Sequence, residues 1–335
     1  MPLVSSAVSS DPAPGRVCPL RYRYGPAALA LAAEQAADTL YVVGGLYGNR
    51  PALDALLQLA AQEPGPVRLC FNGDFNWFNV DDAGFAEINR TVLEHDACLG
   101  NVEAELFSAD DDAGCGCAYP ESVDSGTVER SNRIHRRLKQ AAQRHPELLR
   151  RLEALPMPRR YRVGDLAVGV VHGDAESLAG WRFDAAALDD PAKRDWIEAA
   201  FATARVDVFA SSHTCLPALR RFDRGWVVNN GAAGMPNFRE RCCGIVTRIG
   251  VTPAPTPILY GATVGGVRID ALALDYDGAA WEREFLANWP AESPAHVSYF
   301  RRMIAGPDYS LAQAQGTKPM LAPGQFACEC NAAET

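Results

Sequence analysis

Residues 71–78 read Phe-Asn-Gly-Asp-Phe-Asn-Trp-Phe, and they follow directly on the largely apolar run 67–70, Val-Arg-Leu-Cys. The run predicts a buried β-strand, and Gly73-Asp74 predicts a tight turn at its end that carries one carboxylate. In α/β proteins, ligands collect at the carboxyl ends of the strands. The stretch therefore predicts that Asp74 lies at the edge of a sheet, where a binding site can form.

Three further strand-like segments also end in polar residues. Their motifs are Gly-Asn-Val-Glu around Asn101, Val-His-Gly-Asp around His172 and Ser-His-Thr-Cys around His213. If these strand ends meet that of Asp74, the four side chains supply a carboxylate oxygen, an amide oxygen and two imidazole nitrogens. Such a set suits one divalent transition metal, Mn, Fe, Zn or Ni, better than Ca or Mg.

The remaining chain alternates strand-like and helix-like segments. Residues 39–43 predict a strand, and residues 52–61 and 83–95 predict helices. A helix is also expected over 26–37, because Ala and Leu dominate this run and no breaker interrupts it. Residues 107–125 have no period and predict a long loop. The alternation favours an α/β sandwich over a helix bundle.

Length and composition fit one large domain with short extensions. The chain has 335 residues, of which 48% are hydrophobic, so it can bury a large core. We expect a flexible N-terminal arm over 1–15 and a single domain over 16–290, with its motifs within 39–250. A C-terminal helix and a loose tail are expected over 291–335.

The charge balance and the N-terminus exclude several classes of protein. Lys and Arg number 32 against 41 Asp and Glu, and this net charge of -9 argues against a nucleic-acid-binding face. Residues 1–15 lack the features of a secretory signal, and no run of about 18 apolar residues indicates a membrane span. We therefore expect a cytoplasmic protein whose ten cysteines are thiols, with no membrane partner. The sequence does not indicate an oligomeric state.

The order of these motifs resembles the calcineurin-like metallophosphoesterase superfamily, over roughly residues 39–250. That family carries Asp-x-His, Gly-Asp, Gly-Asn-His-Asp/Glu, a lone histidine and Gly-His-x-His at successive strand ends. Here Asp74, Asn101, His172 and His213 fall on matching positions. The resemblance implies an αββα sandwich of two mixed sheets flanked by helices, and metal-dependent chemistry on phosphoesters.

Several of the family's functional residues are replaced in this sequence. The first-motif aspartate falls on Gly45 and its histidine on Tyr47, while the family's catalytic histidine falls on Val102. The second histidine of the last motif falls on Cys215. The resemblance therefore implies one complete set of metal ligands and leaves a second site open, for which only Asp74 with Cys215 or Tyr47 remains.

The first functional hypothesis is a divergent metal-dependent phosphoesterase that hydrolyses a small-molecule phosphoester with metal-activated water. Asp74, Glu103 and Tyr47 are the expected catalytic residues. Asp74, Asn101, His172, His213 and Cys215 are the expected metal ligands.

Two other classes of function stay open. The replaced residues fit a catalytically silent protein that binds a phosphorylated ligand or a partner protein. They also fit a metalloenzyme whose mononuclear or thiolate-assisted site has been redirected to other chemistry, with one or both of Cys115 and Cys117 joining Cys215 in the thiolate-assisted case. Each residue taken alone also fits a structural role, as a turn aspartate, a core histidine or a small buried cysteine.

Overall fold

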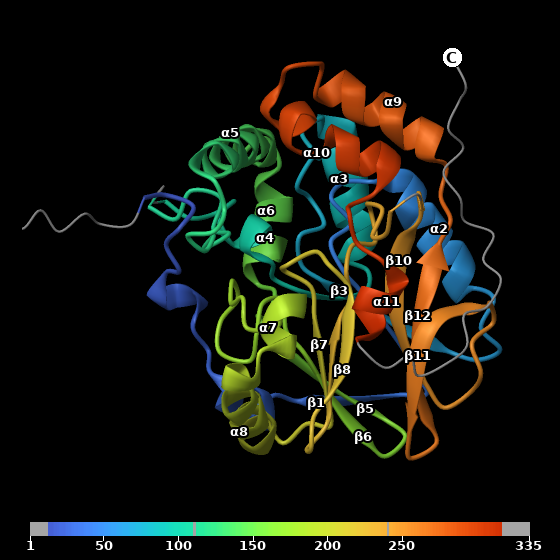
Figure 1. Ribbon diagram of the computed structural model, residues 1–335. Coiled ribbons are helices and arrows are strands. Elements are labelled where there is room, and N and C mark those ends of the chain that lie inside the picture. Colours follow the sequence, from blue (N-terminus) through green and yellow to red (C-terminus); the bar gives the residue numbers. More distant parts are fainter. Residues whose placement is uncertain (1–12, 110–111, 240, 317–335) are drawn as a thin grey trace, which may run out of the picture.

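Two six-stranded mixed sheets pack against each other, with helices on both outer sides (Figure 1). The computed structural model describes residues 13–109, 112–239 and 241–316. The predicted α/β fold class, an αββα sandwich of two mixed sheets flanked by helices, is thereby confirmed.

The first sheet has the strand order β11-β12-β10-β2-β3-β4. Strand β2 pairs in parallel with β3, and β3 pairs in parallel with β4, so these three end at the same edge. The strands are β2 (Thr39–Val43), β3 (Val67–Asn72), β4 (Asp96–Cys98), β10 (Gly244–Gly250), β11 (Ile258–Val264) and β12 (Val267–Leu274).

The second sheet has the order β1-β5-β6-β7-β9-β8. Strands β6, β7 and β9 run parallel, while β5 and β8 pair antiparallel with their neighbours β6 and β9. The strands are β1 (Glu34–Ala37), β5 (Arg159–Val163), β6 (Leu166–Val170), β7 (Val208–Ser211), β8 (Ala218–Arg221) and β9 (Trp226–Asn229).

Helices cover the outer faces and one end of the sandwich, and Figure 1 shows α5, α9 and α10 gathered at that end. Short 3-10 helices lie at Leu20–Tyr22 and Pro191–Lys193. The α-helices are α1 (Pro26–Leu31), α2 (Arg50–Ala60), α3 (Asp82–Val92), α4 (Asn101–Ala104), α5 (Ser125–Ala142), α6 (Pro146–Glu153), α7 (Ala185–Asp189), α8 (Arg194–Ala204), α9 (Gly278–Asn288), α10 (Pro294–Ala305) and α11 (Leu311–Gln315).

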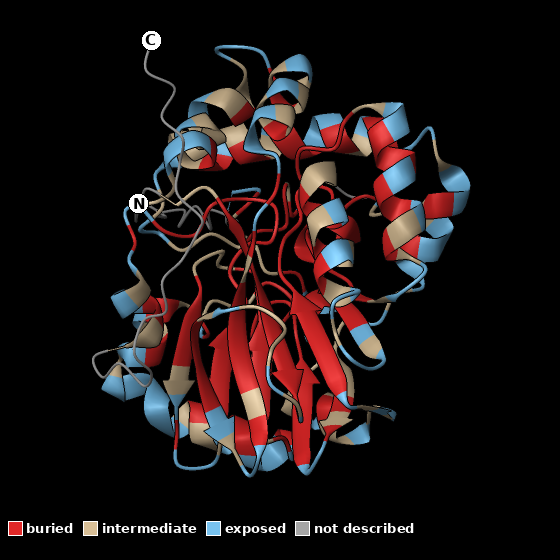
Figure 2. Cartoon of the chain, turned by 90° about the vertical axis from the view of Figure 1, so that its right-hand side faces the viewer, coloured by how far each residue is buried: buried red, intermediate tan, exposed pale blue. Residues whose placement is uncertain are grey.

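Buried apolar side chains join these layers. One cluster connects the two sheets through residues such as Val42 and Cys70 of the first and Val170 of the second. On the outer side of the second sheet, Phe201 of α8 packs against Phe209 of β7, with ring centroids 4.8 Å apart. Figure 2 shows most of the strand residues as buried, whereas the longer helices keep an exposed side.

The helix predicted over residues 26–37 is wrong in its second half. Helix α1 ends at Leu31, and Glu34–Ala37 form the edge strand β1, parallel to β5. The Glu34 carboxylate lies 2.8 Å from Arg160 and 2.9 Å from Arg162, so pairing with β5 supplies ionic partners. These tertiary contacts override the helix propensity of alanine.

The other predicted elements agree with the structure within a few residues. The helices expected over 52–61 and 83–95 are α2 and α3, and the described residues between α4 and α5 form turns without a helix or strand. Residues 306–316 include α11, and Tyr309 is buried and donates a hydrogen bond to the Pro217 carbonyl at 2.9 Å. Most of the predicted arm and tail, residues 1–12 and 317–335, lies outside the described residues. Within the described ranges, no helix combines the length and apolar character that a membrane crossing requires.

Candidate metal centre

Four polar side chains from both sheets meet where their strands end. Asp74 follows β3, Asn101 begins α4 just after β4, His172 follows β6, and His213 follows β7. One ligand atom from each of Asp74, His172 and His213 lies within 4.8 Å of the others, and all three residues are buried. The structure thus brings together four of the five residues predicted as metal ligands, Asp74, Asn101, His172 and His213, and Cys215 is not part of this cluster.

The turn after β3 aims the Asp74 carboxylate into this cluster. Gly73 and Asp74 both have left-handed backbone angles, φ 76° and φ 54°. A Cβ at position 73 would lie 2.6 Å from the Gly100 nitrogen and 2.6 Å from His172 Nδ1, so glycine is required for this close approach. A left-handed aspartate is uncommon and strained, and such conformations gather at functional sites.

Hydrogen bonds orient His172 and Asn101 toward the same point. His172 Nδ1 donates to the Asn72 carbonyl at 2.6 Å, which leaves Nε2 facing the cluster. The Asn101 amide nitrogen donates to the Cys115 carbonyl at 3.0 Å, and its Oδ1 lies 3.1 Å from His172 Nε2. Asp74 Oδ1 lies 3.3 Å from the same Nε2 and accepts from the Val102 N–H at 3.2 Å.

The fourth residue of the cluster, His213, has one ring nitrogen without a hydrogen-bond partner among the described residues. Its Nε2 donates to the Cys117 carbonyl at 3.1 Å, so its Nδ1 carries the lone pair. This Nδ1 is buried and finds no hydrogen-bond partner among the described residues. A buried acceptor without a partner destabilises a fold unless something else satisfies it.

The protonation states of Asp74 and His213 favour binding of a cation, whereas at His172 a cation has to displace a proton. Burial raises the pKa of Asp74, but the opposing effect of His172 and His213 is larger and holds that pKa below its ordinary value. Burial and the neighbouring His172 lower the pKa of His213 to about 4, so its imidazole is neutral near pH 7. Burial lowers the pKa of His172, but the Asp74 charge outweighs this and raises it. Two oxygens and two ring nitrogens that converge in this way fit a divalent cation.

A pocket of about 350 Å³ opens onto the cluster. Asp74, Asn101 and His213 form part of its wall, and the remaining wall comes from other segments, including α5 and α10. These include Tyr47, Trp77, Val102, Cys117, Tyr119, Val123, Thr127, Arg130, Trp181, Thr214, Cys215, Met235, Val297, Ser298, Tyr299 and Arg302. Sequence motifs did not indicate the contributions of α5 and α10, because none of them links these helices to the strand ends.

Comparisons with family models and with curated proteins find no match for this chain. A solved metallophosphoesterase from Sphaerobacter thermophilus has 18% sequence identity and a TM-score of 0.51, covering 80% of this chain and 100% of its own. A hypothetical protein from Pyrococcus horikoshii OT3 has 16% identity and a TM-score of 0.55, covering 81% of this chain and 99% of its own. The chain has the calcineurin-like metallophosphoesterase fold. The resemblance in the sequence is thereby confirmed for the fold.

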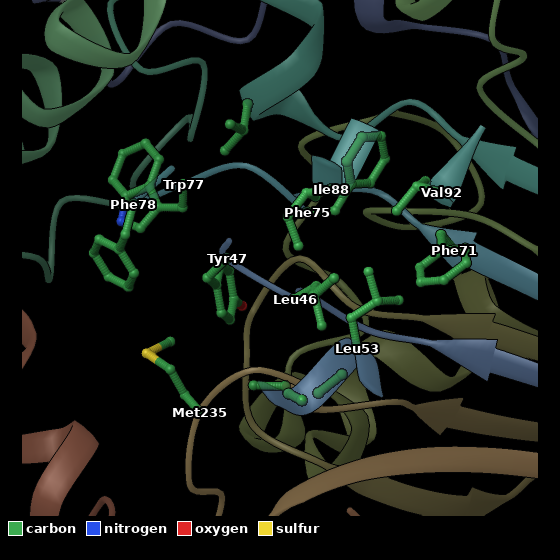
Figure 3. Packing of buried hydrophobic residues seen from close by; sticks show 14 of the residues in the cluster. Leu46, Tyr47, Leu53, Phe71, Phe75, Trp77, Phe78, Ile88, Val92 and Met235 are labelled. Atoms are coloured by element: carbon green, nitrogen blue, oxygen red, sulfur yellow. The ribbon is translucent and has the colours of Figure 1, made fainter. Parts of the chain in front are cut away.

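Within this metallophosphoesterase fold, Tyr47 fills the place of the replaced first-motif ligands. A Cβ at Gly45 would lie 2.5 Å from Tyr47 Cε1 and closer still to the ring's Cζ and Oη. The Tyr47 ring therefore covers Gly45, and its hydroxyl lies 2.9 Å from Cys215 Sγ. Figure 3 shows Tyr47 among the buried apolar side chains, together with Phe78 and Met235.

Glu103, predicted as catalytic, is fully buried behind the cluster and holds the turn after β3. Its Oε2 accepts the Asp74 N–H at 2.7 Å, and its Oε1 accepts the Asn76 N–H at 3.2 Å. Burial and the nearby Asp74 charge raise the pKa of Glu103 to about 7. These contacts make Glu103 a positioning residue for Asp74.

The arrangement of Cys115, Cys117 and Cys215 differs from the thiolate site that the sequence analysis predicted. In the part of the chain that the structure describes, one group of three candidate ligands forms, and it contains no cysteine. Cys115 and Cys117 instead supply backbone carbonyls to Asn101 and His213. Burial raises the pKa of Cys215, which favours the protonated thiol next to Tyr47.

Proposed function

We propose that this protein is a metal-dependent phosphoesterase that acts on a small-molecule phosphoester. In this proposal Asp74, Asn101, His172 and His213 hold one divalent transition metal, Mn, Fe, Zn or Ni. The observation that carries the proposal is that ligand atoms of Asp74, His172 and His213 lie within 4.8 Å of one another, with Asn101 Oδ1 3.1 Å from His172 Nε2. The buried Nδ1 of His213, which has no hydrogen-bond partner among the described residues, supports it. The likeness in fold to a solved metallophosphoesterase supports it.

Hydrogen bonds within the chain orient the proposed metal ligands before any substrate binds. When bound, a divalent cation polarises a phosphoryl oxygen and lowers the pKa of water. His172 and His213 are held in the tautomers that point a lone pair inward, because backbone carbonyls accept their other N–H groups. Asp74 is held by the Val102 N–H, and Glu103 holds the turn that carries it. The aromatic wall of the pocket restricts water around the reacting group.

A second candidate function is binding of a phosphorylated ligand without turnover. The arrangement of Tyr47 favours it, because the ring covers Gly45 and a single metal clamps fewer phosphoryl oxygens than a pair. Val102, which takes the place of the family's catalytic histidine, also offers no group for proton transfer.

The two candidates separate in one set of measurements on anaerobically purified protein. Metal content is measured in the wild type, in Asp74→Asn and in His213→Ala, with the exposed residues Asp54→Asn and His95→Ala as matched controls. We expect one metal per chain in the wild type and controls, and a large loss in both site variants. Hydrolysis of an aryl phosphate is then assayed with Mn, Fe, Zn and Mg.

Turnover that is lost in Asp74→Asn and kept in Asp54→Asn supports the phosphoesterase. Bound metal without turnover favours the ligand-binding candidate. Wild-type protein that takes up no transition metal after reconstitution contradicts the metal centre itself.

A further inference from the structure

Two arginines face the pocket without a carboxylate partner. Arg130 of α5 donates from Nε to Ser298 Oγ at 2.7 Å and from Nη2 to Thr127 Oγ1 at 3.0 Å. Arg302 of α10 donates from Nη2 to the Cys215 carbonyl at 2.8 Å. Within the described ranges, neither forms a salt bridge, although most other arginines near acidic groups do. Arg302 contacts backbone carbonyls of Cys215 and Pro236, so its charge stays available to an anion. Arg130 lies near Asp124, whose pKa is lowered by hydrogen bonds from Thr127 and, to a smaller extent, by the Arg130 charge, so Arg130 offers an anion only part of its charge.

The charge of the pocket wall favours an anionic ligand. In the described part of the chain, Asp74 is the carboxylate that lines this pocket, against the two positive charges of Arg130 and Arg302. A divalent cation on Asp74 would raise the positive charge further. Guanidinium groups bind phosphate oxygens through paired N–H donors, which a pocket for a neutral ligand does not need.

The rest of the wall is aromatic and apolar. Trp77 and Tyr299 lie with ring centroids 6.3 Å apart, and Tyr119 and Trp181 with centroids 6.0 Å apart. Val297 lines the same pocket and remains 58% exposed. A phosphate ion alone would contact few of these side chains, whereas aromatic walls favour the faces and edges of another ring.

We propose that the ligand of this pocket is a phosphate ester of an aromatic alcohol or of a group that carries an aromatic ring. Arg130 and Arg302 bind its phosphoryl oxygens, and the rings of the wall, Tyr299 among them, pack against its aromatic part. This inference rests on the proposed function, because it assigns the substrate class of the same site. It makes α5 and α10 the elements that determine specificity.

Binding of inert phosphonates tests the inference separately from catalysis. Phenylphosphonate and methylphosphonate carry the same charged group, and neither has an ester bond to hydrolyse. Isothermal titration of the metal-loaded protein is expected to show phenylphosphonate binding at least about tenfold tighter. Arg302→Gln and Arg130→Gln are each expected to weaken both phosphonates by about tenfold or more, because each removes a charge-assisted contact. Tyr299→Leu is expected to reduce the preference for the phenyl group and to leave methylphosphonate affinity unchanged.

Matched variants on the same two helices control for net charge. Arg301→Gln on α10 and Arg136→Gln on α5 remove an exposed arginine outside the pocket and are expected to bind both phosphonates like the wild type. Arg302→Lys keeps the charge and loses the paired donors, so an intermediate affinity is expected even if Arg302→Gln folds poorly. Circular dichroism and metal content confirm that each variant is folded and loaded.

The outcomes separate this inference from the proposed function. Equal affinity for the two phosphonates, or pocket variants that bind like the Arg301 and Arg136 controls, overturns the inference even if an aryl phosphate is hydrolysed. The expected binding pattern without hydrolysis supports the inference and removes the phosphoesterase activity.

Discussion

Alanine at Gly45 is expected to destabilise the protein mainly through its nearest neighbour, the Tyr47 ring. The added methyl group would lie 2.5 Å from Tyr47 Cε1 and closer to two further ring atoms, well inside ordinary carbon contacts of about 3.5 to 4.0 Å. The ring cannot withdraw easily. Tyr47 is only 3% exposed, its hydroxyl lies 2.9 Å from Cys215 Sγ, and its backbone is fixed at φ 58°.

The expected magnitude follows from this contact. Overpacking of a buried site costs about 1 to 3 kcal/mol. Gly45→Ala should therefore lower the free energy of unfolding by that amount in the wild type and in Tyr47→Phe, which keeps the ring. In Tyr47→Ala the ring is absent, so the same alanine should cost almost nothing, although Tyr47→Ala alone loses about 3 to 5 kcal/mol by the cavity it creates.

Urea unfolding of the wild type, the three single variants and the two double variants measures the coupling between positions 45 and 47. A coupling free energy of about 1 to 3 kcal/mol is expected for the alanine pair. If the effects of Gly45→Ala and Tyr47→Ala simply add, to within about 0.5 kcal/mol, the ring does not occupy this space. The argument for a single metal would then lose its structural basis.

Three further predictions concern the metal, the turn and a buried ion pair. A transition metal at about 100 times its Kd should stabilise the wild type by about 2.7 kcal/mol in thermal unfolding, and His213→Ala should lose most of this gain. Gly73→Ala should lower both stability and metal content, because its Cβ would lie 2.6 Å from the Gly100 nitrogen; normal metal content in this variant contradicts the proposed role of the turn. Glu63→Gln should destabilise the fold by about 3 to 5 kcal/mol at neutral pH, since it breaks the buried pair with Arg248 at 2.5 Å. Burial raises the pKa of Glu63, but the opposing effect of Arg248 is larger and holds this pKa below 4.5. The loss of unfolding free energy in Glu63→Gln relative to the wild type should therefore be complete above about pH 5 and shrink as the pH falls through the lowered pKa. A loss that does not change with pH in chemical unfolding contradicts this prediction.

The sequence was sufficient to predict four side chains of the cluster from their places at strand ends, although it also predicted Cys215, which the cluster lacks. Parallel pairing of β3 with β4 places Asp74 beside Asn101, and parallel pairing of β6 with β7 places His172 beside His213. The packing of the two sheets then brings these two edges together. The helix expected over 26–37 failed because alanine-rich segments accept either conformation when a neighbouring strand offers hydrogen bonds and ionic partners.

Other parts of the site could not be predicted, because they depend on contacts between distant segments. The Tyr47 ring covers Gly45 because the backbone at Tyr47 is left-handed, which residue type alone does not indicate for tyrosine. Arg130 and Arg302 reach the pocket from α5 and α10, which are separated in sequence by the strands β5 to β12 of both sheets. Neither arginine belongs to a recognisable motif.

The oxygen that fixes the proton on His213 belongs to the main chain at Cys117, and the same oxygen accepts from Trp181 Nε1 at 3.0 Å. Replacement of the cysteine side chain leaves that oxygen where it is. The site at Cys117 therefore tolerates a change of side chain as long as the path of the loop is kept, and a deletion in this loop should disturb His213 more than replacement of the Cys117 side chain does.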